Sequence, residues 1–360
     1  MARRTSAMVI SFEIATIPPP VWLIFHGGGR KTQKPRAKLS LIREDTTMAD
    51  KLKIFSGRPS RGLTQAICSY LGVNPGKAEI FKFSNNNTFV KINENVREAD
   101  VFVVQTSCPP VDQNFMELLI MIDALKRASA RRLTAVLPYY PYGRSDKKDQ
   151  PRVPITARLV ADLLTVAGAD RVVTMDLHAD QIQGFFQIPL DHLTAFSLLS
   201  DYFVRKKLEN PVVVACDAGR AKDAHKYAQK LRAPLAIMDK RRIGNQDKVE
   251  IACFIGDVYG RNAVIFDDEV DTAGTLTETV AALERAGIKD VHAACTHPVF
   301  SGPAVERLIK SSIKEMVITD TVPFAPEKRF DRLTVLSVAP LFAEAIRRIH
   351  LGESISSLFG

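Results

Sequence analysis

Residues 263–275 read AVIFDDEVDTAGT, and this stretch decides the fold because its character changes twice within a short span. Residues 263–266 form an apolar run of strand length, two aspartates follow, and small residues then form a turn. Thr275 and Glu278 have the spacing of a capping box, which predicts that a helix begins at this turn. The stretch therefore predicts a strand, a turn and a helix, as in an α/β protein.

The same alternation of short apolar runs and amphipathic stretches continues along the chain from residue 52. Residues 60–71, for example, place apolar side chains on one helical face. Residues 212–214 are all valine, which indicates a strand that is covered on both faces of a parallel sheet. We therefore expect an α/β fold of mainly parallel sheets flanked by helices. The predicted strands are residues 100–105, 133–137, 171–174, 211–215, 263–266 and 291–294.

The chain has 360 residues, a length that suggests two domains with a core each. We expect domains at residues 48–195 and 196–345, followed by a tail at residues 346–360. Residues 1–47 carry eight Lys or Arg against three acidic residues, and PPP and GGG segments interrupt any periodicity. This leader is predicted to be disordered, and Met48 is a hypothetical natural start of translation.

Charge and cysteine content narrow the class of protein. The net charge of +9 favours anionic partners, but the basic residues are scattered without interleaved aromatics, so no nucleic-acid partner is expected. The five cysteines are odd in number and form no CxxC pair, which favours buried free thiols over zinc or disulfides. The apolar run at residues 21–25 is too short to cross a bilayer, and no export signal is recognised. We expect a cytoplasmic protein without membrane partners.

The turn that follows the two aspartates has the chemistry of a sugar-phosphate site. Backbone N–H groups of residues 271–275 would lie at the positive end of a helix, where a phosphate monoester binds readily. Asp267 and Asp268 would face the same ligand and accept hydrogen bonds from vicinal hydroxyls. The alternative is an acidic loop that leads into a helix and binds no ligand.

The quoted stretch resembles the phosphoribosyl-pyrophosphate loop of type I phosphoribosyltransferases. Further segments resemble ribose-phosphate pyrophosphokinases, and the likeness runs from about residue 51 to residue 359. This resemblance implies two type I phosphoribosyltransferase-like domains and transfer of the β,γ-pyrophosphoryl group of ATP to ribose 5-phosphate. It also implies Mg²⁺ as the cofactor and a homo-oligomer, commonly a hexamer. The segments are residues 92–97 (INENVR), 142–148 (YGRSDKK), 152–156 (RVPIT), 175–186 (MDLHADQIQGFF), 239–242 (DKRR) and 296–302 (THPVFSG).

The resemblance also implies roles for individual residues. The metal ligands would be His178 and Asp217, and the catalytic pair would be Lys240 and Arg242, followed by a loop at residues 243–248. The ATP-binding residues would be Phe83, Asn85, Asn86, Asn87, Arg144, Ser145 and Asp146. The ribose 5-phosphate site would comprise Arg242, Asp267, Asp268, Asp271, Thr272, Ala273, Gly274 and Thr275. The pyrophosphate loop would comprise Asp217, Ala218, Gly219 and Arg220.

Some of these positions depart from the common family pattern. Residues 85–87 are all asparagine where many members have Asp-Gly-Glu, and Ser145 replaces a common glutamine. Nucleotide selectivity is therefore left open. Arg220 stands where many relatives have a second glycine, and it adds positive charge to the pyrophosphate loop.

Single motifs also have simpler interpretations. A lone histidine such as His178 is more often a core residue than a ligand, and a run such as Lys240 to Arg242 is more often a solvated cluster. Two other functions fit part of the pattern. A plain phosphoribosyltransferase would need only the second half of the chain, and a synthetase-associated regulatory subunit would keep the fold without turnover. The intact motifs favour the enzyme, in which Asp271 is the candidate general base.

Overall fold

The computed structural model describes residues 51–242 and 249–358, and the side chains of residues 240–242 and 249–252 are outside this description. The predicted disordered leader, the hypothetical start at Met48 and the predicted loop at residues 243–248 therefore lie outside the described residues. The described residues belong to one unit of the chain, residues 45–360.

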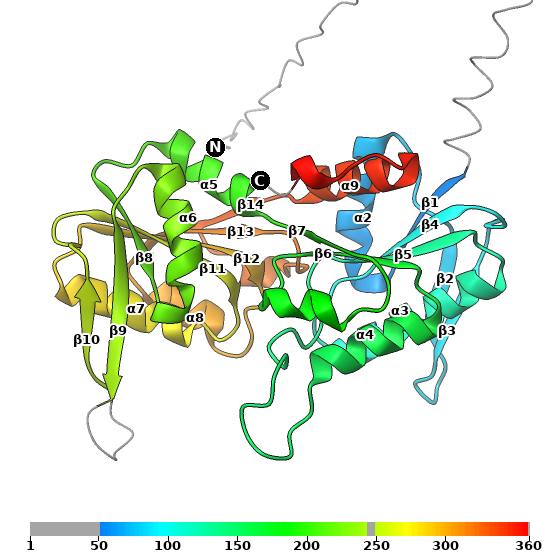
Figure 1. Cartoon of the computed structure of the whole chain (residues 1–360), viewed down its shortest axis with the longest axis horizontal. Helices are drawn as coiled ribbons and strands as arrows, with labels where there is room; N and C mark the ends of the chain where they lie inside the picture. The colour runs from blue at the N-terminus through cyan, green and yellow to red at the C-terminus, as the bar shows by residue number, and fades with distance from the viewer. Residues whose placement is uncertain (1–50, 243–248, 359–360) are drawn as a thin grey trace, which may run out of the picture. The chain divides into compact units, whose positions relative to one another are not determined.

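The first sheet contains five parallel strands, and helices cover both of its faces (Figure 1). Neighbouring residues in β1 alternate between the two faces: Ile54 packs with α2 and α9, whereas Phe55 packs with α3 and α4. The strand order is β1 (Leu52–Ser56), β4 (Asp100–Val104), β5 (Arg132–Leu137), β6 (Arg171–Met175) and β7 (Leu190–Leu193). The helices are α2 (Arg61–Leu71), α3 (Val111–Arg127), α4 (Thr156–Ala167) and α9 (Ala339–Leu351).

The second sheet contains seven strands, and β10 at its edge is the antiparallel member. Its core is also two-sided, since Val213 packs on the face of α5 and α6, and Val214 on the face of α7 and α8. The order is β10 (Val249–Ile255), β9 (Leu235–Arg242), β8 (Pro211–Ala215), β11 (Asn262–Val270), β12 (Asp290–Pro298), β13 (Ile313–Thr319) and β14 (Leu333–Leu336). The helices are α5 (Phe196–Lys206), α6 (Ala221–Leu231), α7 (Gly274–Arg285) and α8 (Ala304–Lys310).

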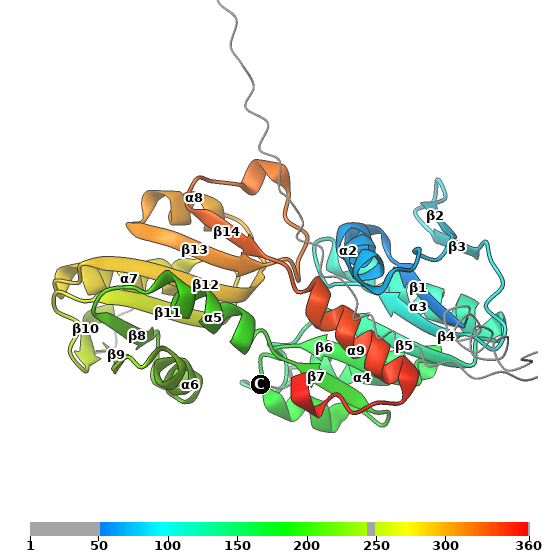
Figure 2. The same ribbon diagram turned by 90° about the horizontal axis from the view of Figure 1, so that it is seen from above.

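Helix α9 ties the end of the chain back to the first sheet, where it packs beside α2 (Figure 2). The buried side chains of α2, α9, α5 and α6 form one continuous cluster with residues of both sheets. A separate hairpin, β2 (Ala78–Lys82) and β3 (Thr88–Ile92), lies against α3. Short 3₁₀ helices are η1 (Arg58–Ser60), η2 (Asp180–Phe185), η3 (Ala218–Arg220), η4 (Pro326–Lys328) and η5 (Ser356–Leu358).

The central strand β11 extends well beyond its neighbour on one side. It pairs with β8 as far as Ile265, but with β12 as far as Val270. The predicted strand at residues 263–266 was therefore too short, because the acidic residues that follow belong to the strand and not to a loop. This extension carries three acidic side chains past the carboxyl end of β8, where ligands of parallel sheets commonly bind.

The predicted α/β class with mainly parallel sheets is confirmed, and the six predicted strands correspond to β4, β5, β6, β8, β11 and β12. The division into domains stays a prediction, and its boundary between residues 345 and 346 falls within α9. Four cysteines are buried as expected, but Cys253 is exposed on edge strand β10. No helix in the described part of the chain combines the length and apolarity that a membrane span requires.

Candidate active site

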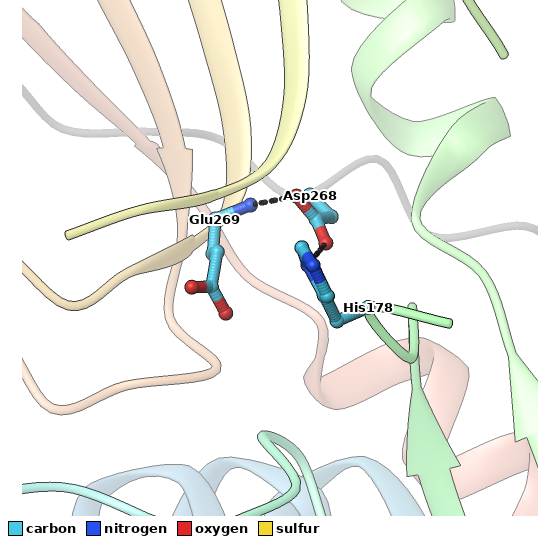
Figure 3. A group of neighbouring side chains, drawn as sticks. All are labelled: His178, Asp268 and Glu269. Atoms are coloured by element: carbon cyan, nitrogen blue, oxygen red, sulfur yellow. Dashed lines mark hydrogen bonds and ion pairs between the residues drawn. The ribbon is translucent and has the colours of Figure 1, made fainter. Parts of the chain in front are cut away.

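The extended end of β11 gathers oppositely charged side chains around the two predicted sugar-binding aspartates. An Nη2 atom of Arg220 lies 3.0 Å from Oδ1 of Asp267 and also pairs with Asp268. Nδ1 of His178 lies 2.7 Å from Oδ2 of Asp268 (Figure 3). Burial raises the pKa of Asp267 to about 6, against the opposing effect of Arg220. Asp267, Asp268 and His178, singled out from the sequence, thus meet at one charged cluster.

The helix after this strand begins two residues earlier than the predicted capping box implies. Helix α7 starts at Gly274, preceded by Ala273 in the left-handed conformation with φ of 60°. The predicted capping box of Thr275 and Glu278 is wrong, because Thr275 already lies inside the first turn and no side chain caps Ala273. The first N–H groups of an α-helix lack intrahelical acceptors, so this end of α7 can receive an anion.

The turn between β11 and α7 is fixed from the direction of α8. Arg307 donates from Nη1 to the carbonyl oxygen of Thr272 at 3.0 Å. The backbone N–H of Ser301 donates to the carbonyl oxygen of Asp271 at 2.9 Å. Carbonyl oxygens of the turn accept both bonds, so neither bond uses a backbone N–H group of the turn.

The histidine turn of the first sheet is anchored by the second sheet. Asp176, directly after β6, has a φ of 37°, which is uncommon for a non-glycine residue. Its Oδ2 accepts hydrogen bonds from the backbone N–H of Ala195 at 3.0 Å and from the hydroxyl of Thr296 at 2.6 Å. These bonds hold a strained residue in place and thereby orient the segment that carries His178.

His297 supports the same turn from inside the protein. Its Nε2 lies 3.1 Å from the carbonyl oxygens of both Met175 and Asp176, and its Nδ1 lies 2.9 Å from the hydroxyl of Thr321. Burial lowers the pKa of His297 to about 4, so the ring is neutral at pH 7. Because carbonyl oxygens only accept, Nε2 carries the proton, and the unprotonated Nδ1 faces the Thr321 hydroxyl.

Glu269 is the third acidic residue on β11, and it connects the cluster to the end of β5. Its Oε2 accepts a hydrogen bond from the Tyr139 hydroxyl at 2.9 Å, and its Oε1 lies 3.5 Å from Nε of Arg144. Arg144 also reaches Asp271, with Nη1 at 3.3 Å from Oδ2. Burial raises the pKa of Tyr139, and the negative charge of Glu269 adds to the effect. Arg144, a predicted nucleotide-binding residue, thus lies over the acidic turn.

The predicted pyrophosphate loop forms η3 at the start of α6. The Asp217 side chain accepts from the backbone N–H of Arg220 at 3.0 Å and so caps this short helix. His178, Asp268 and Glu269 offer ligand atoms that all lie within 4.8 Å of one another. Asp217 is not a member of this group, although its charge contributes to the raised pKa of Asp267.

The other predicted nucleotide-binding residues are divided between two places. Phe83 lies at the turn of the β2–β3 hairpin, and its ring packs against Phe81 and Phe89. Within the described residues, no hydrogen bond, ion pair or ring contact joins Asn85, Asn86 or Asn87 of this turn to the acidic cluster. Among the described residues, the hairpin turn thus has no such contact with Arg144.

Ser145 and Asp146 have structural partners beside Arg144. The Ser145 hydroxyl accepts from the backbone N–H of Thr156 at 3.3 Å, at the start of α4. Asp146 is buried, and Gln181 donates from Nε2 to its Oδ2 at 2.6 Å. This second bond ties the Arg144 loop to η2, the segment directly after His178.

The predicted catalytic pair lies on β9 near the edge of the second sheet. Lys240 is paired in register with Ala252, and Arg242 with Val249. Their side chains lie outside the described part of the chain.

A cavity of about 720 Å³ adjoins the acidic cluster on the side of α6. Among its lining residues are Asp176, His192, Arg220, Tyr227 and Asp267. The end of β6, the end of β11 and the start of α6 therefore all line this cavity.

Sequence reasoning missed Glu269, Tyr139 and His297. Glu269 follows the two aspartates directly, but the predicted strand ended before all three acidic residues. The pattern therefore did not predict on which face of the sheet the Glu269 side chain lies. Tyr139 gave no signal, and His297 lay in the segment of residues 296–302 without an assigned role. The contacts of both join segments that are far apart in the sequence.

Comparisons with known proteins agree with this geometry. Residues 52–168 match the family model described as the N-terminal domain of ribose phosphate pyrophosphokinase, and residues 241–360 match the phosphoribosyl synthetase-associated domain. The ribose-phosphate pyrophosphokinase of Caldanaerobacter subterraneus is 54% identical over 309 residues, covering 86% of this chain and 98% of the relative. That of Clostridium acetobutylicum is 51% identical over 310 residues, covering 86% and 97%. The phosphoribosylpyrophosphate synthetase structure from Mycobacterium smegmatis has a TM-score of 0.80 and 45% identity, covering 84% of this chain and 99% of that one.

Two mainly parallel sheets, with an acidic strand that leads into a helix N-terminus, define an α/β protein of the phosphoribosyltransferase-like class. Within that class, the chain belongs to the ribose-phosphate pyrophosphokinase family. The resemblance seen in the sequence is therefore confirmed.

Proposed function

We propose that the chain transfers the β,γ-pyrophosphoryl group of ATP to the anomeric hydroxyl of ribose 5-phosphate, giving phosphoribosyl pyrophosphate and AMP. One observation carries the proposal. The acidic end of β11 leads directly into the N-terminus of α7 and meets His178 of the first sheet, 2.7 Å from Asp268. The pyrophosphokinase relatives support an active enzyme, and the regulatory-subunit alternative has no such support.

The sugar phosphate would bind where β11 meets α7. The phosphate group would accept hydrogen bonds from the N–H groups at the start of α7, including the turn of Thr272, Ala273, Gly274 and Thr275. Asp267 and Asp268 would accept from the ribose hydroxyls. Both carboxylates now pair with Arg220, so this arginine would turn from the aspartates toward the transferred pyrophosphate, together with the loop of Asp217 to Gly219.

Phosphoryl-type transfer depends mostly on positioning and on neutralising charge that develops on phosphate oxygens. Arg144, whose side chain is 61% exposed beside the acidic turn, would offer its positive charge to a bound triphosphate. Lys240 and Arg242 would add positive charge from β9. Phe83 and the asparagines of its turn would contact adenine, while Ser145 and Asp146 would support the Arg144 loop. Asp271 remains the candidate general base.

Mg²⁺ is the proposed cofactor, and the donor set fits it. His178 and Asp268 lie together, Asp217 is close enough to raise the pKa of Asp267, and waters would complete the oxygen ligands that Mg²⁺ prefers. When bound, the cation would neutralise triphosphate oxygens. We further propose a cytoplasmic homo-oligomer, a hexamer as the resemblance implies, with two domains at residues 48–195 and 196–345 and no nucleic-acid or membrane partner.

A phosphorus NMR time course of the purified chain with Mg-ATP and ribose 5-phosphate tests the activity. Growth of AMP and of a new sugar pyrophosphate signal is expected, and the Lys240→Ala variant should lose both. GTP and CTP are tested in parallel, because the asparagines at residues 85–87 and Ser145 leave nucleotide selectivity open. A wild-type spectrum that stays unchanged with all three nucleotides would contradict the proposed function.

A further inference from the structure

Glu269 has a position that no assigned role explains. Its side chain is 7% exposed, and its carboxylate belongs to the group formed with His178 and Asp268, whose ligand atoms lie within 4.8 Å of one another (Figure 3). Tyr139 donates to Oε2 of Glu269, whereas Oε1 lies 3.5 Å from Nε of Arg144. That distance is longer than a hydrogen bond, and the Arg144 side chain is 61% exposed.

The charges around Glu269 do not balance within the described part of the chain. The end of β11 and the following turn carry the carboxylates of Asp267, Asp268, Glu269 and Asp271, whereas their guanidinium partners are Arg220 and Arg144. Four carboxylates against two arginines leave an excess that one divalent cation would offset.

We propose that Glu269 is a further protein ligand of the divalent cation, acting together with His178 and Asp268, and that Arg144 leaves Glu269 when the cation binds. This inference rests on the proposed function and deepens its metal site. Oε1 of Glu269 would contact the cation, while the Tyr139 hydroxyl keeps Oε2 in place. Arg144 would then be free to contact the nucleotide phosphates, so that cation binding prepares the nucleotide site.

Titration of the full chain with Mn²⁺ alone, followed by the electron paramagnetic resonance signal of free Mn²⁺, tests the inference without turnover. Mn²⁺ accepts both imidazole and carboxylate ligands. The variant Glu269→Gln keeps the size of the side chain and an oxygen that can accept from Tyr139. We expect it to weaken Mn²⁺ binding by about tenfold or more, the scale on which even outer-shell changes act.

Two controls separate direct binding from a general effect of charge. Asp271→Asn removes one charge from the same turn, outside the three-residue group, and should weaken binding by less than about threefold at ordinary screening. Asp257→Asn removes a charge from an exposed residue that precedes β11 and should leave the affinity unchanged. Equal losses in Glu269→Gln and Asp271→Asn, or no loss in Glu269→Gln, would overturn the inference.

A second readout identifies the ligands themselves. Electron spin-echo modulation of bound Mn²⁺ should show a histidine nitrogen that disappears in His178→Ala, and this coupling should change in Glu269→Asp, which keeps the charge but shortens the reach. An unchanged coupling in Glu269→Asp, combined with wild-type affinity in Glu269→Gln, would rule out Glu269 as a ligand. Phosphorus NMR keeps the two proposals apart: wild-type turnover with unaltered Mn²⁺ binding in Glu269→Gln would refute only the role of Glu269.

Discussion

Two clusters of this chain combine aspartate, arginine and histidine, with opposite electrostatic results. The first lies where α9 meets the start of β4. Arg132 donates to Asp100 from Nε at 2.8 Å and from Nη2 at 2.5 Å, and Nδ1 of His350 lies 2.8 Å from the same carboxylate. Burial alone would raise the pKa of Asp100, but the bonds from His350 and Arg132 together lower it.

The second cluster lies at the end of β11. One arginine, Arg220, is shared between Asp267 and Asp268, and His178 contacts Asp268. Burial raises the pKa of Asp267 to about 6, and Glu269 adds repulsion that Arg220 does not overcome.

The difference indicates what each cluster is for. In the first, each charge has its partner inside the protein, so the cluster fixes a helix to a sheet. In the second, negative charge remains in excess at the edge of a cavity, which is the arrangement expected where a ligand supplies the missing positive charge. Residue types alone do not distinguish the two clusters, whereas the direction of the pKa shifts does.

The largest effect is expected from Asp268→Asn. This change removes the carboxylate that contacts His178 and that would accept from the ribose hydroxyls, so kcat/KM for ribose 5-phosphate should fall by on the order of 100-fold or more. Coupled AMP release measures the loss, and the midpoint of urea unfolding should stay close to that of the wild type. The matched variant Asp100→Asn should keep its activity per folded molecule. Full activity in Asp268→Asn would contradict the assignment of the cluster at the end of β11 to substrate binding.

The next largest effect is expected on stability, from Asp100→Asn. The change leaves the partly buried Arg132 without its carboxylate and should cost about 2 kcal/mol, less than a fully buried pair because the arginine is partly exposed. The pKa of Asp100 is lowered on folding, so its contribution is present above about pH 4 and is lost as the pH falls further. Urea unfolding at several pH values measures this, and the gap from wild type should close in acid. A gap that is independent of pH would contradict the assignment.

Asp267→Asn should show the opposite pH signature. A carboxyl whose pKa is raised to about 6 favours the folded state when protonated, and this contribution is lost as the pH rises through that value. The ligand-free variant should therefore be more stable than wild type above pH 6, by roughly 1 to 2 kcal/mol after allowance for its ion pair with Arg220. The two proteins should converge below about pH 4. Equal stability at pH 8 would show that Arg220 compensates Asp267 fully, and the two clusters would then be alike.

Much of the fold could be predicted because buried parallel strands have a local signature. Apolar runs such as residues 212–214 mark strands wherever helices cover both faces of a sheet. The extension of β11 could not be predicted this way. Its residues Asp267 to Glu269 are charged like a loop, and they form a strand because β12 offers pairing partners as far as Pro298.

The candidate site was only partly visible in the sequence for the same reason. Asp267, Asp268 and His178 stood out through motifs, but the contact between His178 and Asp268 joins two different sheets. The role of Glu269 depends on its contacts with Tyr139 and Arg144, which are distant from it in the sequence. Local patterns identify which residues can do chemistry, whereas their charge balance depends on neighbours that only the tertiary structure supplies.

The smallest effect is expected from His350→Gln. This change tests how much His350 and Arg132 each contribute to the stability of the first cluster. Arg132 keeps both of its bonds to Asp100, and glutamine can still donate, so the free energy of unfolding should fall by less than about 1 kcal/mol. His178→Gln is the matched change in the second cluster. His178 is 35% exposed and contacts a carboxylate that Arg220 also holds, so its stability loss should be equally small, while Mn²⁺ binding should weaken. Urea unfolding and Mn²⁺ titration of both variants measure this. If His350→Gln cost as much as Asp100→Asn, the histidine would be an essential partner of Asp100, and the balance of the first cluster would not depend mainly on Arg132.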